Sequence, residues 1–310
     1  MKLQMVNVTR KFGDFCAVDD LNLTITNGVY GLLGVNGAGK TTLMRMICTL
    51  LPPTSGKILC DGKDIFKMDG EYRNLLGYLP QEFGFYPDFT VKDYLMYIAS
   101  LKGIRSMIAG KRVKELLEQV GLAKSVNKKM KKLSGGMKRR AGIAQAMLNN
   151  PKILILDEPT AGLDPTERVR FRNLISELSE ERIVILSTHI VSDVEYIANE
   201  IWLMKEGQIV QQGDLDHMLA SMQENVYACE VSQAEATKMM KQFKVSNMKA
   251  ERGMVELRII ADQPPIHGAS VVEPTLEDVF LYYFGEKGGE MERYVLKLKK
   301  FFLKLLAGYR

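Results

Sequence analysis

The sequence has few cysteines and no long apolar run. Its four cysteines, Cys16, Cys48, Cys60 and Cys229, are too scattered for a CxxC metal site and too few for a disulfide framework in 310 residues. No apolar run reaches the roughly 18 residues of a membrane-spanning helix, and the opening MKLQMVNVTRKFGD lacks the apolar middle of a signal peptide. We therefore expect reduced thiols and a protein that stays on the cytoplasmic side of the membrane.

The sequence also lacks a strong charge, internal repeats and low-complexity blocks. A formal net charge of +5 is small for this length, so it argues neither for nor against nucleic acid as a partner. Hydrophobic residues make up 46% of the chain, an ordinary share for a soluble protein with a buried core. Disordered, collagenous and fibrous classes are excluded.

Apolar runs that alternate with helical stretches predict an α/β fold. The runs VYGLLG, KILILD and IVILSTH are typical of mainly parallel strands with helices on their faces. Strand signals in LQMVNVTR, LNLTIT and GKILCDGKDI predict an added antiparallel layer. The helical character of residues 92–150 indicates an inserted helical subdomain.

The chain changes character after residue 215. Strand-like NVYACEVS, VSNMKA and MVELRII, with helix-like AEATKMMKQF and TLEDVFLYYF, predict a small α+β module over residues 222–285.

A lysine-rich stretch, residues 290–310, predicts a basic amphipathic helix. Such a helix suits the surface of an anionic bilayer, and the alternative is packing on the module or on a partner. The apolar face would contain Met291, Tyr294, Val295, Leu298, Phe301, Phe302 and Leu305, and the basic face Arg293, Lys297, Lys300 and Lys304.

The clearest motif is a phosphate-binding loop. GVNGAGKT, residues 34–41, fits G-x-x-x-x-G-K-[ST] between an apolar strand and an amphipathic helix, the context that the motif requires. Glycines let backbone N–H groups face phosphate oxygens, Lys40 brings a charge to the terminal phosphates, and Thr41 places a hydroxyl on Mg²⁺. The predicted binding residues are Gly34, Asn36, Gly37, Ala38, Gly39, Lys40, Thr41 and Thr42.

Polar side chains follow two further apolar strands. In ILILDEPT the apolar run is followed by Asp157 and Glu158, which emerge where the neighbouring strand delivers its phosphate loop. An Asp for Mg²⁺ and a Glu that orients or deprotonates water are what hydrolysis of a terminal phosphate requires. In IVILSTHI the apolar run is followed by Thr188 and His189, at the edge of the sheet where a polar residue has a reason to face the ligand.

The motifs together resemble those of ATP-binding cassette (ABC) proteins. GVNGAGKTT, YLPQ, LSGGM, ILILDEPTAGLD and STH follow in that family's order and approximate spacing over about residues 1–215. The resemblance implies an ATPase with ATP and Mg²⁺ as cofactors. It also implies a head-to-tail dimer in which LSGG of one cassette contacts the γ-phosphate of ATP held by the other.

The resemblance assigns further roles at matching positions. Ser134, Gly135 and Gly136 would contact the γ-phosphate across the dimer. Gln81 would ligate Mg²⁺ and sense the γ-phosphate, and Asp164 would link the two sites.

Three positions are less clear-cut. Phe12 lies where the family stacks an aromatic ring on adenine, with Val18 as an apolar neighbour; a core phenylalanine is the alternative. The commonest family signature ends in Gln where this chain has Met137. Because the phosphate contacts belong to the Ser134 hydroxyl and the glycine backbone, we expect activity to survive.

The resemblance implies a nucleotide-binding subunit that powers a separate membrane-spanning permease from the cytoplasmic face of the membrane. The segment VVEPTLEDVFLYYFG resembles the C-terminal module of bacterial drug, antibiotic and bacteriocin-immunity exporters. Expected partners are a second cassette subunit, identical or different, the permease, and anionic lipid through residues 290–310. No nucleic acid is expected.

The alternative class is a soluble ABC ATPase that acts as a nucleotide switch or on nucleic acid or ribosomes. Ribosome-acting members usually carry two cassettes, and DNA-repair members carry a long coiled coil; this sequence shows neither.

The aromatic stretch after Gln81 is a candidate partner surface. In EFGFYPDFTVKDYL, we expect Phe83, Phe85 and Tyr86 to lie near a groove that receives a permease helix, or else to form the core of the helical subdomain.

Overall fold

The structure, a computed structural model, describes residues 1–223, 225–251 and 253–285. The chain divides into two units, one spanning Met1–Asp214 and one that begins at Leu215. The helix expected over residues 290–310, with its lipid contact, lies outside the described residues. Within the described ranges, no helix is both long and apolar enough to cross a membrane.

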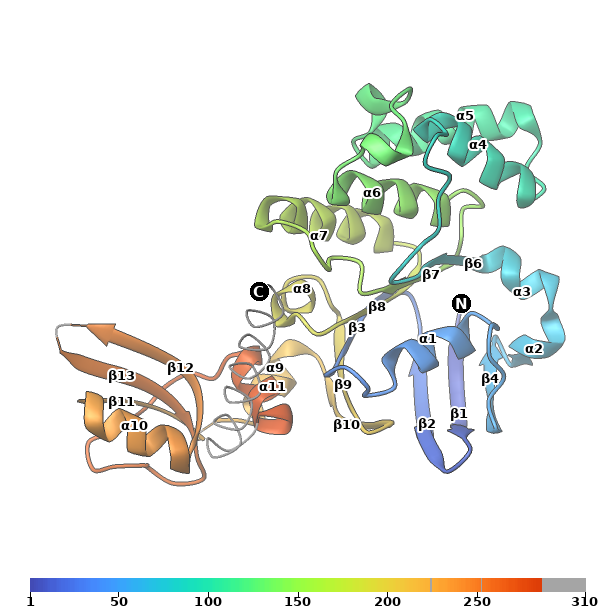
Figure 1. Cartoon of the computed structure of the whole chain (residues 1–310). Helices are drawn as coiled ribbons and strands as arrows, with labels where there is room; N and C mark the ends of the chain where they lie inside the picture. Colours follow the sequence, from blue (N-terminus) through green and yellow to red (C-terminus); the bar gives the residue numbers. More distant parts are fainter. Residues whose placement is uncertain (224, 252, 286–310) are drawn as a thin grey trace, which may run out of the picture. The chain divides into compact units, whose positions relative to one another are not determined.

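A six-stranded sheet forms the centre of the first unit, in the order β10-β9-β3-β8-β7-β6 (Figure 1). All neighbours are parallel except β9 and β10. Every residue of β7 and β8 is buried, as expected for parallel strands covered on both faces. The strands are β3 (Gly28–Leu33), β6 (Leu76–Leu79), β7 (Ile153–Asp157), β8 (Ile183–Thr188), β9 (Glu200–Lys205) and β10 (Gln208–Gly213).

Helices connect these strands, and those that begin at Lys40, Pro165 and Val191 pack on the sheet. The amphipathic stretch after the phosphate loop continues to Leu51, but the helix ends at Ile47, because Thr49 has a φ of 58° and turns the chain. The connecting helices are α1 (Lys40–Ile47), α2 (Ile65–Met68), α3 (Gly70–Leu75), α7 (Pro165–Ser179) and α8 (Val191–Glu195).

An antiparallel sheet, ordered β2-β1-β4-β5, forms the second layer of this unit. It shares one hydrophobic core with α1 and the six-stranded sheet; Trp202 is fully buried there, with its ring 5.1 Å from that of Tyr30. The strands are β1 (Leu3–Phe12), β2 (Phe15–Ile25), β4 (Ser55–Cys60) and β5 (Lys63–Asp64).

A helical insertion leaves the sheet after β6 and returns at β7. Helix α6 packs on β6, and the other two helices pack on α6 (Figure 1). The predicted fold class, an α/β core with an antiparallel layer and a helical insertion, is confirmed. The elements are α4 (Val91–Leu101), α5 (Ser106–Gln119), α6 (Gly135–Ala146) and two 3₁₀ turns, Ala123–Ser125 and Met130–Lys132.

The second unit is an antiparallel sheet ordered β12-β13-β11-β14, with α10 packed on one face. The α+β module in the predicted fold class is confirmed, although the two-residue strand β14 was not predicted. The elements are α9 (Leu215–Ala220), β11 (Val226–Ser232), α10 (Gln233–Gln242), β12 (Lys244–Glu251), β13 (Met254–Ile260), β14 (Ser270–Val271) and α11 (Leu276–Phe284).

A buried ion pair joins α11 to β13. Nε and Nη2 of Arg258 donate to the fully buried carboxylate of Asp278, at 3.0 and 2.7 Å to Oδ2. The Thr275 backbone N–H and hydroxyl donate to the same oxygen at 2.8 Å. Burial by itself would raise the pKa of Asp278, but hydrogen bonds from Arg258, Ser246 and Thr275 outweigh it and hold that pKa below its ordinary value.

We expect Arg258→Ala to lower the free energy of unfolding of the second unit by about 3 kcal/mol, because a buried carboxylate then loses its cationic partner. The pair's contribution is fully present above about pH 4, the ordinary pKa of Asp, and is lost as pH falls through the depressed pKa. Hydrogen exchange of the β11 and β13 amides at pH 7 and pH 3 measures both effects. Lys249→Ala, which removes only the exposed Lys249–Glu251 pair, is the matched control and should change little. Equal effects of the two substitutions would contradict the assignment.

Candidate functional site

The loop between β3 and α1 packs tightly against its neighbours. Gly37 and Gly39 have φ angles of 87° and 106°, which disfavour residues with a side chain. A Cβ on Gly34 would lie 2.4 Å from the Met204 carbonyl oxygen, and one on Gly39 would lie 2.2 Å from that of Ala17. The loop therefore keeps its backbone N–H groups free of side-chain cover at the start of α1, where anions bind.

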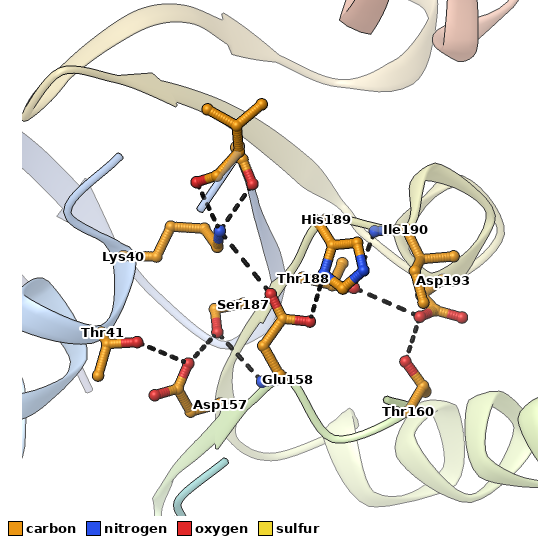
Figure 2. Close-up of polar contacts among 12 residues, drawn as sticks. Lys40, Thr41, Asp157, Glu158, Thr160, Ser187, Thr188, His189, Ile190 and Asp193 are labelled. Carbon is orange, nitrogen blue, oxygen red and sulfur yellow. Dashed lines mark hydrogen bonds and ion pairs between the residues drawn. The ribbon is translucent and has the colours of Figure 1, made fainter. Parts of the chain in front are cut away.

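Lys40 is buried at the start of α1. Its Nζ donates to the carbonyl oxygens of Gly34 and Val35, at 2.6 and 3.2 Å, and lies 3.7 Å from Oε1 of Glu158 (Figure 2). Burial lowers the pKa of Lys40, against the opposing effects of Glu158 and Asp157. The ammonium group thus lies between the phosphate loop and the carboxylate after β7.

Asp157 ends β7 with a partly satisfied carboxylate. Its Oδ1 accepts hydrogen bonds from the hydroxyls of Ser187 and Thr41, at 2.5 and 3.5 Å. Its Oδ2 is buried and has no hydrogen-bond partner among the residues that the structure describes. A free carboxylate oxygen beside a threonine hydroxyl is a donor set that fits Mg²⁺.

Glu158 follows with a strained backbone. It has a φ of 47° and a side chain that is 6% exposed, and its backbone N–H donates to the Ser187 carbonyl oxygen at 3.0 Å. Its Oε2 lies 2.9 Å from Nδ1 of the half-exposed His189 (Figure 2). Strained non-glycine residues cluster at functional sites, and this one presents its carboxylate between a lysine and a histidine.

Lys40 and Glu158 line a cavity of about 450 Å³ at the phosphate loop, whereas Asp157 and His189 are not among its lining residues. It contains most of the predicted binding residues, together with two that the sequence reading missed, Phe15 and Ala17. The lining residues are Phe15, Ala17, Asn36, Gly37, Ala38, Gly39, Lys40, Thr41, Thr42, Gln81 and Glu158.

The predicted adenine-contacting residues do not line this cavity. Val18 is fully buried in the hydrophobic core. Phe12 is 46% exposed, with the Arg10 guanidinium 4.6 Å from the centre of its ring. Phe12 and Phe15 are direct partners in the β1–β2 pairing, so both rings lie at the same end of that hairpin. The second aromatic of RKFGDFCAV was the signal that could have identified Phe15.

Gln81 follows β6 and lines the cavity. The preceding carbonyl, that of Pro80, accepts a hydrogen bond from Nη1 of Arg139 on α6 at 3.3 Å. Arg139, which the sequence reading did not single out, thus ties α6 to the start of the Gln81 loop. Burial lowers the pKa of this guanidinium.

The LSGG segment lies apart from this cavity. Ser134 is exposed and caps α6, its hydroxyl accepting from the Met137 backbone N–H at 3.2 Å. Neither Ser134 nor Gly135 nor Gly136 lines the phosphate-loop cavity. Within one chain, the structure does not bring the two predicted phosphate-binding segments together.

Asp164 is exposed and caps α7. Its Oδ1 accepts from the Glu167 backbone N–H at 2.9 Å. A Cβ on Gly136 would lie 2.8 Å from the Glu167 carboxylate, so α6 and α7 approach closely.

The aromatic stretch after Gln81 is partly packed and partly exposed. Phe83 lies over Gly142 of α6, where an added Cβ would come within 3.1 Å of its ring. Phe85 is half-buried, with the Lys138 ammonium 5.2 Å from its ring centre. Tyr86 is 48% exposed and lies edge-on to Tyr97. Phe83 therefore packs on a helix of the helical subdomain, the second of the two expected placements, whereas Tyr86 reaches the surface.

A parallel sheet with a glycine loop after one strand and an Asp-Glu pair after another defines a P-loop nucleoside triphosphatase. Residues 18–161 match the ABC transporter family. One relative is the uncharacterised ABC transporter ATP-binding protein YxlF of Bacillus subtilis, 41% identical over 67% of this chain and 68% of YxlF. Another is the bacitracin transport ATP-binding protein BcrA of Bacillus licheniformis, 39% identical over 70% of this chain and 71% of BcrA.

One solved structure extends the comparison to nucleotide. The ATP-binding cassette MJ0796, dimeric in a post-hydrolysis state with ADP and phosphate, superposes with a TM-score of 0.62 and 27% identity over 69% of this chain and 98% of MJ0796. The chain belongs to the ABC transporter family, as its sequence motifs predicted. It is an ATP-binding ATPase of that family.

We expect Gly39→Ala to destabilise the first unit by more than about 3 kcal/mol and to abolish ATP binding, because the new methyl group would overlap the Ala17 carbonyl. Gly37→Ala is the matched control: its φ is also positive, but an added Cβ meets nothing within 4 Å, so only backbone strain of about 1–2 kcal/mol follows. Thermal unfolding and binding of a fluorescent ATP analogue measure the two outcomes. Equal losses in both variants would show that backbone strain, and not close packing, decides.

Proposed function

We propose that this chain is the ATP-hydrolysing subunit of an exporter, acting on a separate membrane-spanning permease from the cytoplasmic face of the membrane. The observation that carries the proposal is the split site: Lys40 and Glu158 line one cavity, while Ser134 lies exposed outside it. A second cassette subunit, identical or different, completes each site. The proposed cassette spans residues 1–215, with its helical subdomain at 92–150, and residues 222–285 form an accessory module.

The phosphate loop and Lys40 hold the β- and γ-phosphates of ATP. Lys40 exchanges the Gly34 and Val35 carbonyl oxygens for phosphate oxygens, so its buried ammonium group gains negatively charged hydrogen-bond partners. Phe12 or Phe15, at the end of the β1–β2 hairpin, stacks on adenine.

Asp157, Thr41 and Gln81 would hold Mg²⁺. The unpartnered Oδ2 of Asp157 and the adjacent Thr41 hydroxyl support this assignment. When bound, the ion neutralises charge on the phosphates. Ser187 orients Asp157 by donating to its other oxygen.

Glu158 orients the attacking water and accepts its proton as the oxygen bonds to the γ-phosphorus and the bond to ADP breaks. His189, whose Nδ1 lies 2.9 Å from the Glu158 carboxylate, holds that carboxylate in position and faces the γ-phosphate with its other ring nitrogen. The 2.9 Å contact supports the first of these two roles.

The second chain contributes the Ser134 hydroxyl and the backbone of Gly135 and Gly136. The side chain of Met137 is not needed for this contact, since the Ser134 hydroxyl and the glycine backbone make it. Asp164, exposed at the start of α7, reaches across to the partner's site.

The permease binds beside the Gln81 loop, where Tyr86 reaches the surface and Phe85 is half-buried. An export substrate of the drug, peptide or amphiphile class is supported by the similarity to BcrA, whose name assigns it to bacitracin transport. Purification of the chain from membranes together with a membrane-spanning partner tests this part; recovery with ribosomes or nucleic acid would overturn it.

We expect Lys40→Ala to lose ATP binding, and Glu158→Gln to bind ATP, to accumulate a closed dimer and to lose at least about 100-fold in kcat. Ser134→Arg should also be inactive, because it blocks the site of the partner chain. Light scattering with ATP and a phosphate-release assay measure these outcomes.

A mixture of two inactive variants provides the control. A heterodimer of Ser134→Arg with Glu158→Gln retains one complete site, whose base is Glu158 from the first chain and whose serine is Ser134 from the second. Mixing should therefore restore hydrolysis. Turnover by a strictly monomeric species, or no recovery on mixing, would refute the two-chain site.

We expect Phe85→Ala to reduce transport while leaving the basal ATPase rate within about twofold of wild type, because partner contacts at aromatic anchors dominate binding. Transport into inverted vesicles and hydrolysis by the detergent-solubilised subunit are measured side by side. Tyr196→Ala, a change at an exposed aromatic residue elsewhere in the same unit, is the control and should affect neither. Loss of folded protein in Phe85→Ala would instead assign the ring to the core of the helical subdomain.

A further inference from the structure

We propose that Asp193 is a positioning residue for hydrolysis: it joins the loop after β7 to the loop after β8 and so sets the approach of His189 to Glu158. The inference rests on the proposed roles of these two residues. Asp193 lies in α8, outside every motif of the sequence.

The Asp193 carboxylate bridges two segments that are far apart in the chain. Its Oδ2 accepts a short hydrogen bond from the Thr160 hydroxyl and a second, at 3.4 Å, from the Thr188 hydroxyl (Figure 2). The Thr188 oxygen in turn accepts from the Ile190 backbone N–H at 3.0 Å. One carboxylate oxygen therefore fixes both loops at the carboxyl end of the sheet.

The two threonines flank the proposed catalytic pair. Thr160 lies two residues after Glu158, and Thr188 directly precedes His189. Asp193 thus contacts both threonines, while Glu158, which lines the cavity, meets His189 at 2.9 Å. If the distance between the two loops changed, the distance between Glu158 and His189 would change with it.

The burial of this cluster argues against a purely stabilising role. Thr160, Thr188 and Asp193 are all fully buried, and Oδ1 of Asp193 has no hydrogen-bond partner in the described part of the chain. A buried carboxylate with one oxygen unpaired stabilises a fold poorly compared with an apolar side chain of the same size. Its hydroxyl contacts are charge-assisted and directional, which suits the fixing of a geometry.

The strained backbone of Glu158 explains why the loop after it needs a hydrogen-bonded anchor. A residue with a φ of 47° keeps that conformation only where its surroundings determine it from several sides. Ser187 holds the Glu158 backbone N–H, and the Asp193 cluster holds the chain two residues further on. Between these two anchors the carboxylate has little freedom to turn away from His189.

The test compares Thr160→Val with Thr160→Ser. Valine keeps the shape but removes the hydroxyl, so kcat should fall about tenfold while KM for ATP stays within about twofold. Serine keeps the hydroxyl and should retain most of the wild-type kcat. Asp193→Asn, which keeps the shape and removes the charge, should fall between these two.

A second background separates positioning from general damage. In Glu158→Gln the proposed base is already absent, so adding Thr160→Val should lower the residual rate little further. A tenfold loss in both backgrounds would overturn the inference, as would a wild-type kcat in Thr160→Val, or a loss that follows ATP affinity and thermal stability. Full activity of Glu158→Gln would instead refute the proposed role of Glu158.

Discussion

The site depends on the position of β8 between β3 and β7. In this register Thr188 pairs with Leu33, the last residue before the phosphate loop, and Ser187 pairs with Asp157. Because side chains alternate along a strand, a slip by one residue would turn Ser187 away from Asp157 and exchange the orientations of Thr188 and His189. The continuous burial of β7 and β8 makes such a slip costly, so a buried and chemically inert part of the fold determines the geometry of its polar edge.

Much of this arrangement could be predicted because it is local in the sequence. The loop with Lys40, and the strand that ends in Asp157 and Glu158, each combine a continuous apolar run with a polar end, and parallel strands bring such ends to one edge. The Ser187 and Asp193 contacts could not be predicted in this way. Each joins residues about 30 positions apart in the chain. The residues next to Asp193 in the sequence do not distinguish it from an acid that faces solvent.

The adenine-contacting residues show a different limit. Phe12 and Phe15 are separated by a two-residue turn and face each other across β1 and β2. A family resemblance selects one of them by alignment, whereas the cavity is lined by the other. The sequence pattern predicts an aromatic hairpin end, but the choice between two rings depends on side-chain packing, including the Arg10 contact that holds Phe12.

The pairing of Lys40 with Glu158 links the phosphate loop to the carboxylate through charge as well as position. Both side chains are 6% exposed, and Nζ of Lys40 lies 3.7 Å from Oε1 of Glu158. Replacing either by a neutral residue leaves the other charge buried without its counter-ion, a penalty that is separate from any loss of chemistry. The stabilities of the two positions are therefore coupled: removing both charges should cost less free energy of unfolding than the sum of the two single substitutions.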